Sequence, residues 1–166
     1  MKPRRLAQRS DAKPDRILEV LIANEVEFVV IGGVAAIAHG VSRITRDLDL
    51  VVGTSKDNRR RTIKALVELE AREYRPASKK WVRIRANADP DWLLRQPRLC
   101  DSRYGGIDIC NAIKAAPSWK QARATAIEVD AFGLSFLVLG KDALIKSKLA
   151  AGREQDKADV AELNEP

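Results

Sequence analysis

The sequence predicts an α/β (α+β) fold in which a small mixed β-sheet is flanked by helices and the C-terminus is helical. Segments with the two-residue periodicity of strands alternate along the chain with segments of helical periodicity. After the last expected strand, residues 134–139, only helical patterns follow. With 166 residues and 45% hydrophobic content, the chain is long enough for one domain with its own core.

The chain is expected to begin with an arm over residues 1–13, because this segment is basic and has almost no apolar anchor. Such a segment is expected to be mobile, and it could touch RNA backbone or equally be a terminus without a binding role. The single domain would then span residues 14–166. Pro14 suits the first turn of a helix that runs to about Ala23. Its apolar positions have helical spacing: Ile17, Leu18, Leu21 and Ile22. A first strand follows over residues 26–31.

A glycine pair follows this first strand. The apolar run ends at Ile31, Gly32 and Gly33 come next, and a helix of small residues then extends to about Gly40. The start of that helix exposes backbone N–H groups where the helix dipole favours an anion. Without Cβ atoms, the two glycines let a phosphate approach the main chain. A tight strand-to-helix turn would need the same glycines, so the two interpretations are compatible.

A second strand carries two carboxylates in the run Asp-Leu-Asp-Leu-Val-Val. Because side chains alternate along a strand, Asp47 and Asp49 emerge on one face. Strand interiors are depleted in Asp and neighbouring like charges repel, so we expect a metal cation between these carboxylates. The alternative is a strand edge that faces water without a metal. Together with the glycine pair, the carboxylates suit a nucleoside triphosphate bound with magnesium.

The glycine pair, a spacer of thirteen residues and the Asp-Leu-Asp-Leu run resemble the signature of the polymerase-beta-like nucleotidyltransferase superfamily. The resemblance implies the nucleotidyltransferase fold and a third carboxylate on a later strand of the same sheet. Asp108 fits, because Ile107 and Ile109 would face the core while Asp108 faces the other side. An exposed strand residue without a catalytic role is the alternative.

The segment Gly140–Leu163 extends the resemblance. It is similar to the Lys…Arg…Asp…Asp helical segment of the small abortive-infection type nucleotidyltransferase toxins and their uncharacterised relatives. With residues 28–52 and 105–110, the matching stretches cover about a third of the chain. The glycine pair, the Asp-Leu-Asp-Leu run and the later Ile-Asp-Ile, found in this order, are more specific than any one of them alone.

The resemblance implies in-line attack by an acceptor hydroxyl on the α-phosphate of a nucleotide, with release of pyrophosphate. Asp47, Asp49 and Asp108 would be the catalytic residues and the ligands of two Mg²⁺ ions, with Mn²⁺ as the alternative metal. Nucleotide contacts are implied for a further set: Gly32, Gly33, Ser42, Arg43, Lys148, Arg153 and Asp156. Ser42 and Arg43 could equally be turn residues.

The C-terminal members of this set have alternatives too. Lys148 and Arg153 would contact the triphosphate, and Lys146 could take the place of Lys148. Arg153 and Asp156 are three residues apart, so a surface ion pair explains their spacing nearly as well. His39, the single histidine, is expected in packing or capping rather than as a base, so no Ser-His-Asp or Cys-His arrangement is available.

The middle of the chain is expected to contain a helix capped by Thr54 or Ser55. Its inward residues would be Ile63, Leu66, Val67 and Leu69, and the run of residues 59–61 would form a solvated arginine face. Between residues 71 and 104, the alternation from Trp81 predicts a strand, and a helical turn is expected after Pro90. The remaining charges there are expected in loops, with a phosphate-binding groove as the alternative: Arg95, Arg98, Arg103 and Tyr104.

The C-terminal part is expected to contain a turn or short helix at residues 117–119, then strands over residues 126–130 and 134–139. Asp142 would lie in the first turn of a helix that Gly152 ends. The inward residues of that helix would be Leu144, Ile145 and Leu149. The final helix carries Ala158, Val160 and Leu163.

The net charge of +7 and the pI near 9.6 favour an anionic partner such as a nucleotide or RNA. The leading hypothesis is transfer to RNA, with the end of tRNA as a candidate acceptor, in a toxin-like enzyme that would have a cognate antitoxin. One alternative is the same chemistry on a protein or small-molecule hydroxyl. Another is a non-catalytic protein of this fold that binds a nucleotide or a partner.

The sequence also predicts a cytoplasmic protein without a membrane span. Its apolar runs are shorter than a bilayer requires, and no apolar signal core follows the basic N-terminal residues. Cys100 and Cys110 are too few for a disulfide scaffold and have no metal-ligand spacing, so both are expected as reduced thiols.

Overall fold

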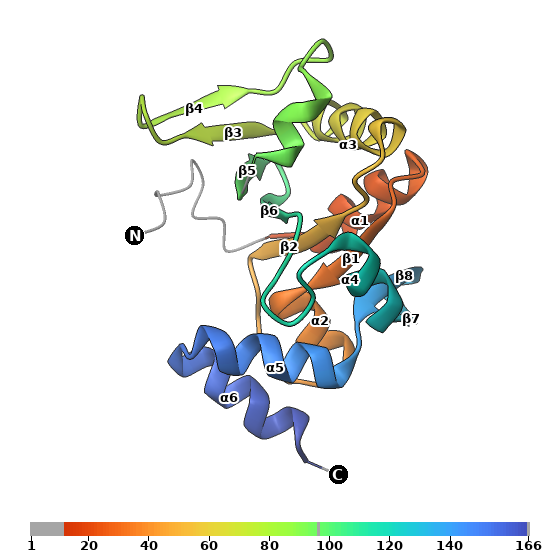
Figure 1. Ribbon diagram of the computed structural model, residues 1–166, viewed down its shortest axis with the longest axis vertical. Helices are drawn as coiled ribbons and strands as arrows, with labels where there is room; N and C mark the ends of the chain where they lie inside the picture. Colours follow the sequence, from red (N-terminus) through yellow and green to blue (C-terminus); the bar gives the residue numbers. More distant parts are fainter. Residues whose placement is uncertain (1–11, 96, 166) are drawn as a thin grey trace.

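The computed structural model describes residues 12–95 and 97–165, which form one eight-stranded mixed sheet with helices packed on it (Figure 1). The strand order is β4-β3-β5-β6-β2-β1-β8-β7. The strands are β1 (Phe28–Ile31), β2 (Asp47–Val52), β3 (Arg72–Arg75), β4 (Lys80–Arg83), β5 (Arg98–Ser102), β6 (Gly105–Cys110), β7 (Ala126–Ala131) and β8 (Leu134–Leu139). The helices are α1 (Pro14–Ala23), α2 (Gly32–Ala38), α3 (Lys56–Glu68), η1 (Pro90–Leu94), α4 (Trp119–Thr125), α5 (Lys141–Ala151) and α6 (Glu154–Leu163).

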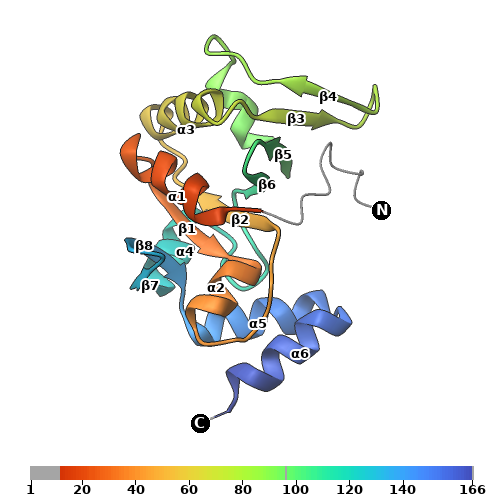
Figure 2. The ribbon, with the colours of Figure 1, turned by 180° about the vertical axis from the view of Figure 1, so that it is seen from behind.

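Two ends of the molecule flank the central strands. The β3–β4 hairpin lies at one end, and α5 and α6 pack together at the other (Figures 1 and 2). The predicted fold class is therefore confirmed, including the helical C-terminus. Of the expected arm, residues 1–11 lie outside the described residues, while the N–H of Lys13 donates to the carbonyl of Tyr104 at 2.8 Å.

The centre of the sheet is built on β2, which pairs with β1 in the antiparallel direction and with β6 in the parallel direction. Leu48 and Leu50 are fully buried in the core, whereas Asp47 and Asp49 are only partly buried on the other face. The expected alternation along this strand is thus confirmed.

The helix α1 has the predicted bounds, but the strand after it begins at Phe28 rather than at residue 26. Glu25 adopts a φ of 54°, and the N–H of Val26 donates to Leu21 at 3.0 Å. These residues close the helix end, so pairing with β2 starts later. Ile22 lies on the outer side of α1 and is partly exposed, unlike Leu18.

The helix α3 begins as predicted, with Ser55 accepting a hydrogen bond from the N–H of Asn58. The expected solvated arginine face is wrong at its first member. Arg59 is buried and donates to the carbonyl of Thr54 and, at 2.7 Å, to Asp91 on η1. Arg60 is exposed as expected. Arg59 is buried because η1 packs against α3 at this position.

Residues 71–104 contain more sheet than the sequence pattern predicts. The strand at Trp81 and the turn after Pro90 are confirmed as β4 and η1. The strands β3 and β5 were not predicted, because charged residues interrupt their apolar alternation. Arg98, expected in a loop, begins β5 and lies 5.1 Å from the Trp92 ring centroid, and burial lowers its pKa.

The polar packing of α5 against α6 corrects another expectation. Gly152 ends α5 in a left-handed conformation, with a φ of +65°, as predicted. Leu149, expected to face inward, is 60% exposed, whereas Lys148 is only 4% exposed. Asp156 and Asp159 of α6 are the buried partners of this lysine. Among the described helices, none has the length and apolar content needed to cross a membrane.

Candidate active site

A cavity of about 300 Å³ lies between the ends of β1 and β2 and the helices α5 and α6. Eight of the ten predicted site residues line it: Gly32, Gly33, Arg43, Asp47, Asp49, Lys148, Arg153 and Asp156. Asp108 and Ser42 are not among its lining residues. Segments that are far apart in the sequence therefore meet at one hollow.

The glycine pair fits tightly beneath this cavity. Gly32 has a φ of +66°, and a Cβ atom there would lie 2.9 Å from Cγ of Asp49. A Cβ atom on Gly33 would lie 2.8 Å from Oγ1 of Thr45. Since Cβ atoms do not tolerate such distances, the absence of a side chain at residues 32 and 33 makes room for Asp49 and Thr45.

The three predicted acidic residues share one face of the sheet. Asp47 and Asp49 are two residues apart on β2, and Asp49 lies directly opposite Asp108 on β6 in the parallel register. Asp108 is only 4% exposed, so it lies beside the cavity wall rather than on it. No group of three His, Cys, Asp or Glu residues within the described part of the chain is arranged as a ready metal cluster.

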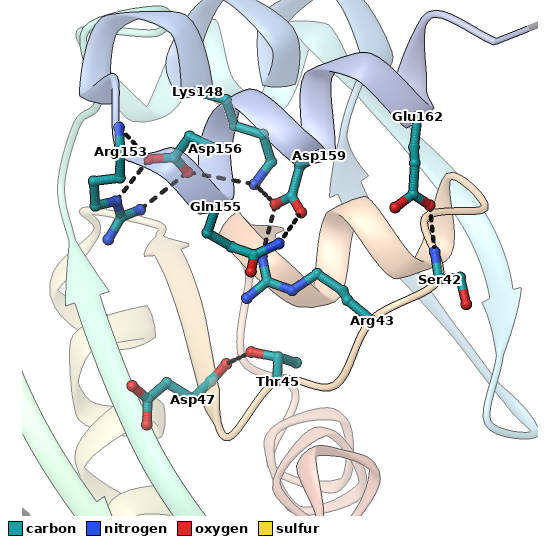
Figure 3. Close-up of polar contacts among 10 residues, drawn as sticks. All are labelled: Ser42, Arg43, Thr45, Asp47, Lys148, Arg153, Gln155, Asp156, Asp159 and Glu162. Atoms are coloured by element: carbon teal, nitrogen blue, oxygen red, sulfur yellow. Dashed lines mark hydrogen bonds and ion pairs between the residues drawn. The ribbon is translucent and has the colours of Figure 1, made fainter.

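Asp159 joins two cations of the site (Figure 3). Its Oδ2 accepts from Nζ of Lys148 at 2.5 Å and from a guanidinium nitrogen of Arg43 at 2.6 Å. The carboxylate is completely buried, and Gln155 donates to its other oxygen at 2.9 Å. Burial opposes the charged form of Asp159, but the hydrogen bonds from Lys148, Gln155 and Arg43 and the charge of Lys148 outweigh it, so its pKa lies below the ordinary value.

Asp156 and Arg153 form a second pair at the start of α6 (Figure 3). Nε of Arg153 donates to Asp156 at 2.6 Å, and Nζ of Lys148 lies 3.7 Å from the same carboxylate. The ion pair expected from their spacing is present, but Asp156 itself is buried. Burial opposes its charge, yet Arg153 and Lys148 lower its pKa overall. The same hydrogen bond raises the pKa of Arg153, whose side chain remains 69% exposed.

Ser42 and His39 are not among the lining residues of the cavity. Ser42 is exposed, and its backbone N–H donates to Glu162 of α6 at 2.8 Å (Figure 3). It therefore ties the loop before β2 to α6, as a turn residue would. Nε2 of His39 lies 2.8 Å from the carbonyl of Leu139 and donates to it, so the single histidine caps a strand end as expected.

Sequence reasoning missed four polar residues of this region: Thr45, Ser147, Gln155 and Asp159. The last Asp of the Lys…Arg…Asp…Asp pattern was the signal that could have found Asp159, which lies three residues after Asp156 on the helix. Thr45, Ser147 and Gln155 belong to no motif and reach the site only through folding. Lys146, the alternative to Lys148, is exposed.

The family model described as "Nucleotidyltransferase of unknown function (DUF6036)" matches residues 15–164. The chain belongs to this family. This nucleotidyltransferase is accordingly an enzyme, and the resemblance to the polymerase-beta-like superfamily is confirmed. No curated protein sequence matches it.

Solved structures of low sequence identity share the fold of this nucleotidyltransferase. Lincosamide antibiotic adenylyltransferase LnuA, bound to lincomycin, is 15% identical and has a TM-score of 0.61, covering 93% of this chain and 98% of that one. ANT(2")-Ia in complex with adenylyl-2"-tobramycin is 16% identical, with a TM-score of 0.60 and coverage of 90% and 84%. A putative nucleotidyltransferase from Thermotoga maritima is 14% identical, with a TM-score of 0.56 and coverage of 91% and 93%. Nucleotidyltransferases of this fold generally use divalent metals.

Proposed function

We propose that this nucleotidyltransferase moves a nucleoside monophosphate from a nucleoside triphosphate to an acceptor hydroxyl on RNA and releases pyrophosphate. One observation carries the proposal. Asp47 and Asp49 line the same cavity as Lys148 and Arg153, so carboxylates and cations surround one space. Phosphoryl transfer needs both kinds of group, because the metal-bound triphosphate is negatively charged.

The donor set fits a divalent cation. Carboxylate oxygens are the ligands that Mg²⁺ prefers, and Asp47, Asp49 and Asp108 supply them from two adjacent strands. These residues would hold two Mg²⁺ ions, with Mn²⁺ as the alternative. When bound, the metal would neutralise charge on the phosphates and favour ionisation of the acceptor hydroxyl. Asp108, next to Asp49, would then lie closest to the acceptor side.

The cations have distinct tasks in this proposal. Arg153 is largely exposed at the cavity and would pair with phosphate oxygens. Lys148 and Arg43 are fixed by Asp159, so their positive groups are held in place before the nucleotide arrives. Gly32 and Gly33 line the same cavity, so the phosphates would lie next to this part of the main chain.

RNA is the first of two candidates for the acceptor. The net charge of +7 supports RNA, with a tRNA end as the acceptor of a toxin-like enzyme that has an antitoxin partner. A small-molecule hydroxyl is the second candidate, because lincomycin-bound LnuA and the ANT(2")-Ia complex with adenylyl-2"-tobramycin share the fold over at least 90% of this chain.

Incorporation of α-labelled nucleotides tests both candidates. The wild-type protein and an Asp47→Asn/Asp49→Asn variant would be incubated with Mg²⁺, each of the four nucleotides, and total RNA, total protein, lincomycin or tobramycin. Label in RNA that disappears with the variant is the expected result. Label in an antibiotic alone would favour the small-molecule acceptor. No transfer to any acceptor, although the variant and the wild type are equally folded, would contradict the proposal.

A further inference from the structure

The sheet register connects the acidic residues of the site with the β3–β4 hairpin. Asp47 lies opposite Gly106, Gly106 opposite Asp101, Asp101 opposite Arg72, and Arg72 opposite Arg83. Residues that lie directly opposite on neighbouring strands share a face of the sheet. Arg72 and Arg83 are therefore on the same face of the sheet as Asp47 and Asp49. Three strand spacings of about 4.8 Å separate β2 from β3.

An aromatic pair lies on this face, next to the two arginines. Tyr74 is two residues after Arg72 and lies opposite Trp81, with ring centroids 5.4 Å apart and ring planes inclined at 57°. Both rings are partly exposed. The hairpin is strongly basic, since residues 72–85 contain six Lys or Arg and one acidic residue, Glu73.

Like charges lie close together in the hairpin, although Arg75 pairs with Glu73 at 2.8 Å and Arg83 with Glu70 at 3.7 Å. Two of its four cross-strand pairs, Arg72 with Arg83 and Arg75 with Lys80, bring like charges directly opposite each other. Such pairs are destabilising. β4 is an edge strand, and charge on an edge prevents pairing with other chains. Protection of the sheet edge explains the charged side chains of the hairpin. It does not explain why Tyr74 and Trp81 lie partly exposed between them.

We propose that Tyr74, Trp81, Arg72 and Arg83 form a platform that binds a single-stranded segment of the RNA acceptor. Aromatic rings stack with bases of any sequence, and neighbouring arginines pair with the phosphates. The shared sheet face lets one strand of RNA extend from the platform to the site with Asp47 and Asp49. This inference rests on the proposed function, because it assumes an RNA acceptor.

Binding of a fluorescein-labelled single-stranded oligoribonucleotide, measured by fluorescence anisotropy at several salt concentrations, tests the platform. Tyr74→Leu/Trp81→Leu is expected to raise the Kd about tenfold or more, since base stacking on one aromatic ring has an effect of that order. Arg72→Gln/Arg83→Gln is expected to lower the salt dependence of binding by about one phosphate contact per arginine.

Matched controls replace exposed residues elsewhere. Phe132→Ala removes an exposed aromatic ring from the β7–β8 turn, and Lys120→Gln/Arg123→Gln removes two exposed cations from α4. Both should bind RNA as the wild type does. All variants would first be compared by thermal unfolding. Glutamine retains two of the three methylene groups of arginine, so Arg72→Gln/Arg83→Gln should remain folded. This variant therefore tests the platform even if the aromatic variant unfolds.

Two results would overturn the inference. One is absence of RNA binding by the wild type, and the other is wild-type affinity in both folded platform variants. Asp47→Asn/Asp49→Asn separates this question from the proposed reaction, because it should bind the oligoribonucleotide but transfer nothing. If the wild type binds RNA through the platform but labels only another acceptor, the platform stands and the proposed RNA reaction fails.

Discussion

The carboxylate of Asp49 lies where a Cβ atom of residue 32 would otherwise be placed. A Cβ atom on Gly32 would lie 2.9 Å from Cγ of Asp49 and still closer to its Oδ2. The glycine that ends the first strand thus determines the position of a carboxylate on the second. This relationship makes the glycine pair part of the acidic site as well as part of a turn.

Gly32→Ala is expected to abolish nucleotide transfer, because the new methyl group would displace Asp49. Gly133→Ala is the matched control, since Gly133 has a similar φ of +73° but nothing within 4 Å of its Cβ position. Both substitutions should cost about 1–2 kcal/mol for the left-handed backbone. Transfer assays and urea unfolding would separate the two effects. Equal activity of the two variants would show that Asp49 tolerates the displacement.

Removal of the two carboxylates on β2 is expected to weaken metal binding directly. Asp47→Asn/Asp49→Asn should lower the affinity for Mn²⁺ in the presence of a non-hydrolysable nucleotide by at least about tenfold. Titration monitored by electron paramagnetic resonance measures this without any turnover. Asp142→Asn, an exposed residue in the first turn of α5, serves as the control. Unchanged Mn²⁺ affinity in the double variant would refute the assigned ligands.

Asp159→Asn is expected to destabilise the fold by about 3–5 kcal/mol, because it leaves the buried cation of Lys148 without its nearest carboxylate. The Km for the nucleotide should also rise, since Arg43 and Lys148 lose their common anchor. Glu162→Gln on the same helix is the control and should change stability by less than about 0.5 kcal/mol. Urea unfolding decides between these values, and a loss equal to that of the control would contradict the role of Asp159.

Acid should weaken the packing of α6. The pKa values of Asp156 and Asp159 are lower in the folded chain than their ordinary value of about 3.9. Their contribution to stability is therefore fully present above that pH and is lost as the pH falls through the lower folded-state values. Unfolding free energies measured at several pH values from 7 to 3 should show this decrease. Asp159→Asn should decrease less steeply than the wild type, and identical slopes would argue against these carboxylates.

Neighbouring arginines on α3 should differ in their effect on stability. Arg59 is buried and hydrogen-bonded to Asp91, so Arg59→Ala is expected to cost about 1–3 kcal/mol. Arg60 is exposed, and its contact with Asp57 is 3.4 Å long, so Arg60→Ala should change stability by less than about 0.5 kcal/mol. Thermal unfolding of the two variants side by side provides the comparison. Similar melting temperatures would mean that the packing of η1 does not depend on Arg59.

Strands in which apolar and polar residues alternate clearly could be predicted from the sequence. The pattern around Asp47 and Asp49 predicted both the strand and its two faces, because Leu48 and Leu50 alternate with the carboxylates and are buried on the opposite face. The strand β3 could not be predicted in the same way. Its residues, Arg-Glu-Tyr-Arg, contain one apolar ring, and their place in the sheet depends on pairing with β4 and β5.

The residues that line the cavity were predictable where a motif contains them, and not where folding alone brings them together. Thr45 and Gln155 reach the cavity through the loop before β2 and through α6, and no spacing rule connects these segments. Leu149 was assigned to the core because apolar periodicity assumes an apolar interface. The interface of α5 with α6 is ionic instead, so Lys148 takes the buried position.

Because residues of α6 line the cavity, the proposed active site is completed only late during synthesis of the chain. Asp159 is 112 residues after Asp47 in the sequence, yet it holds the cations that face the same cavity. A nascent chain that has folded only as far as α5 would have its acidic residues in place without an anchor for Lys148 and Arg43. Ribosome-bound intermediates of this length should therefore remain inactive until α6 has left the exit tunnel and docked on α5.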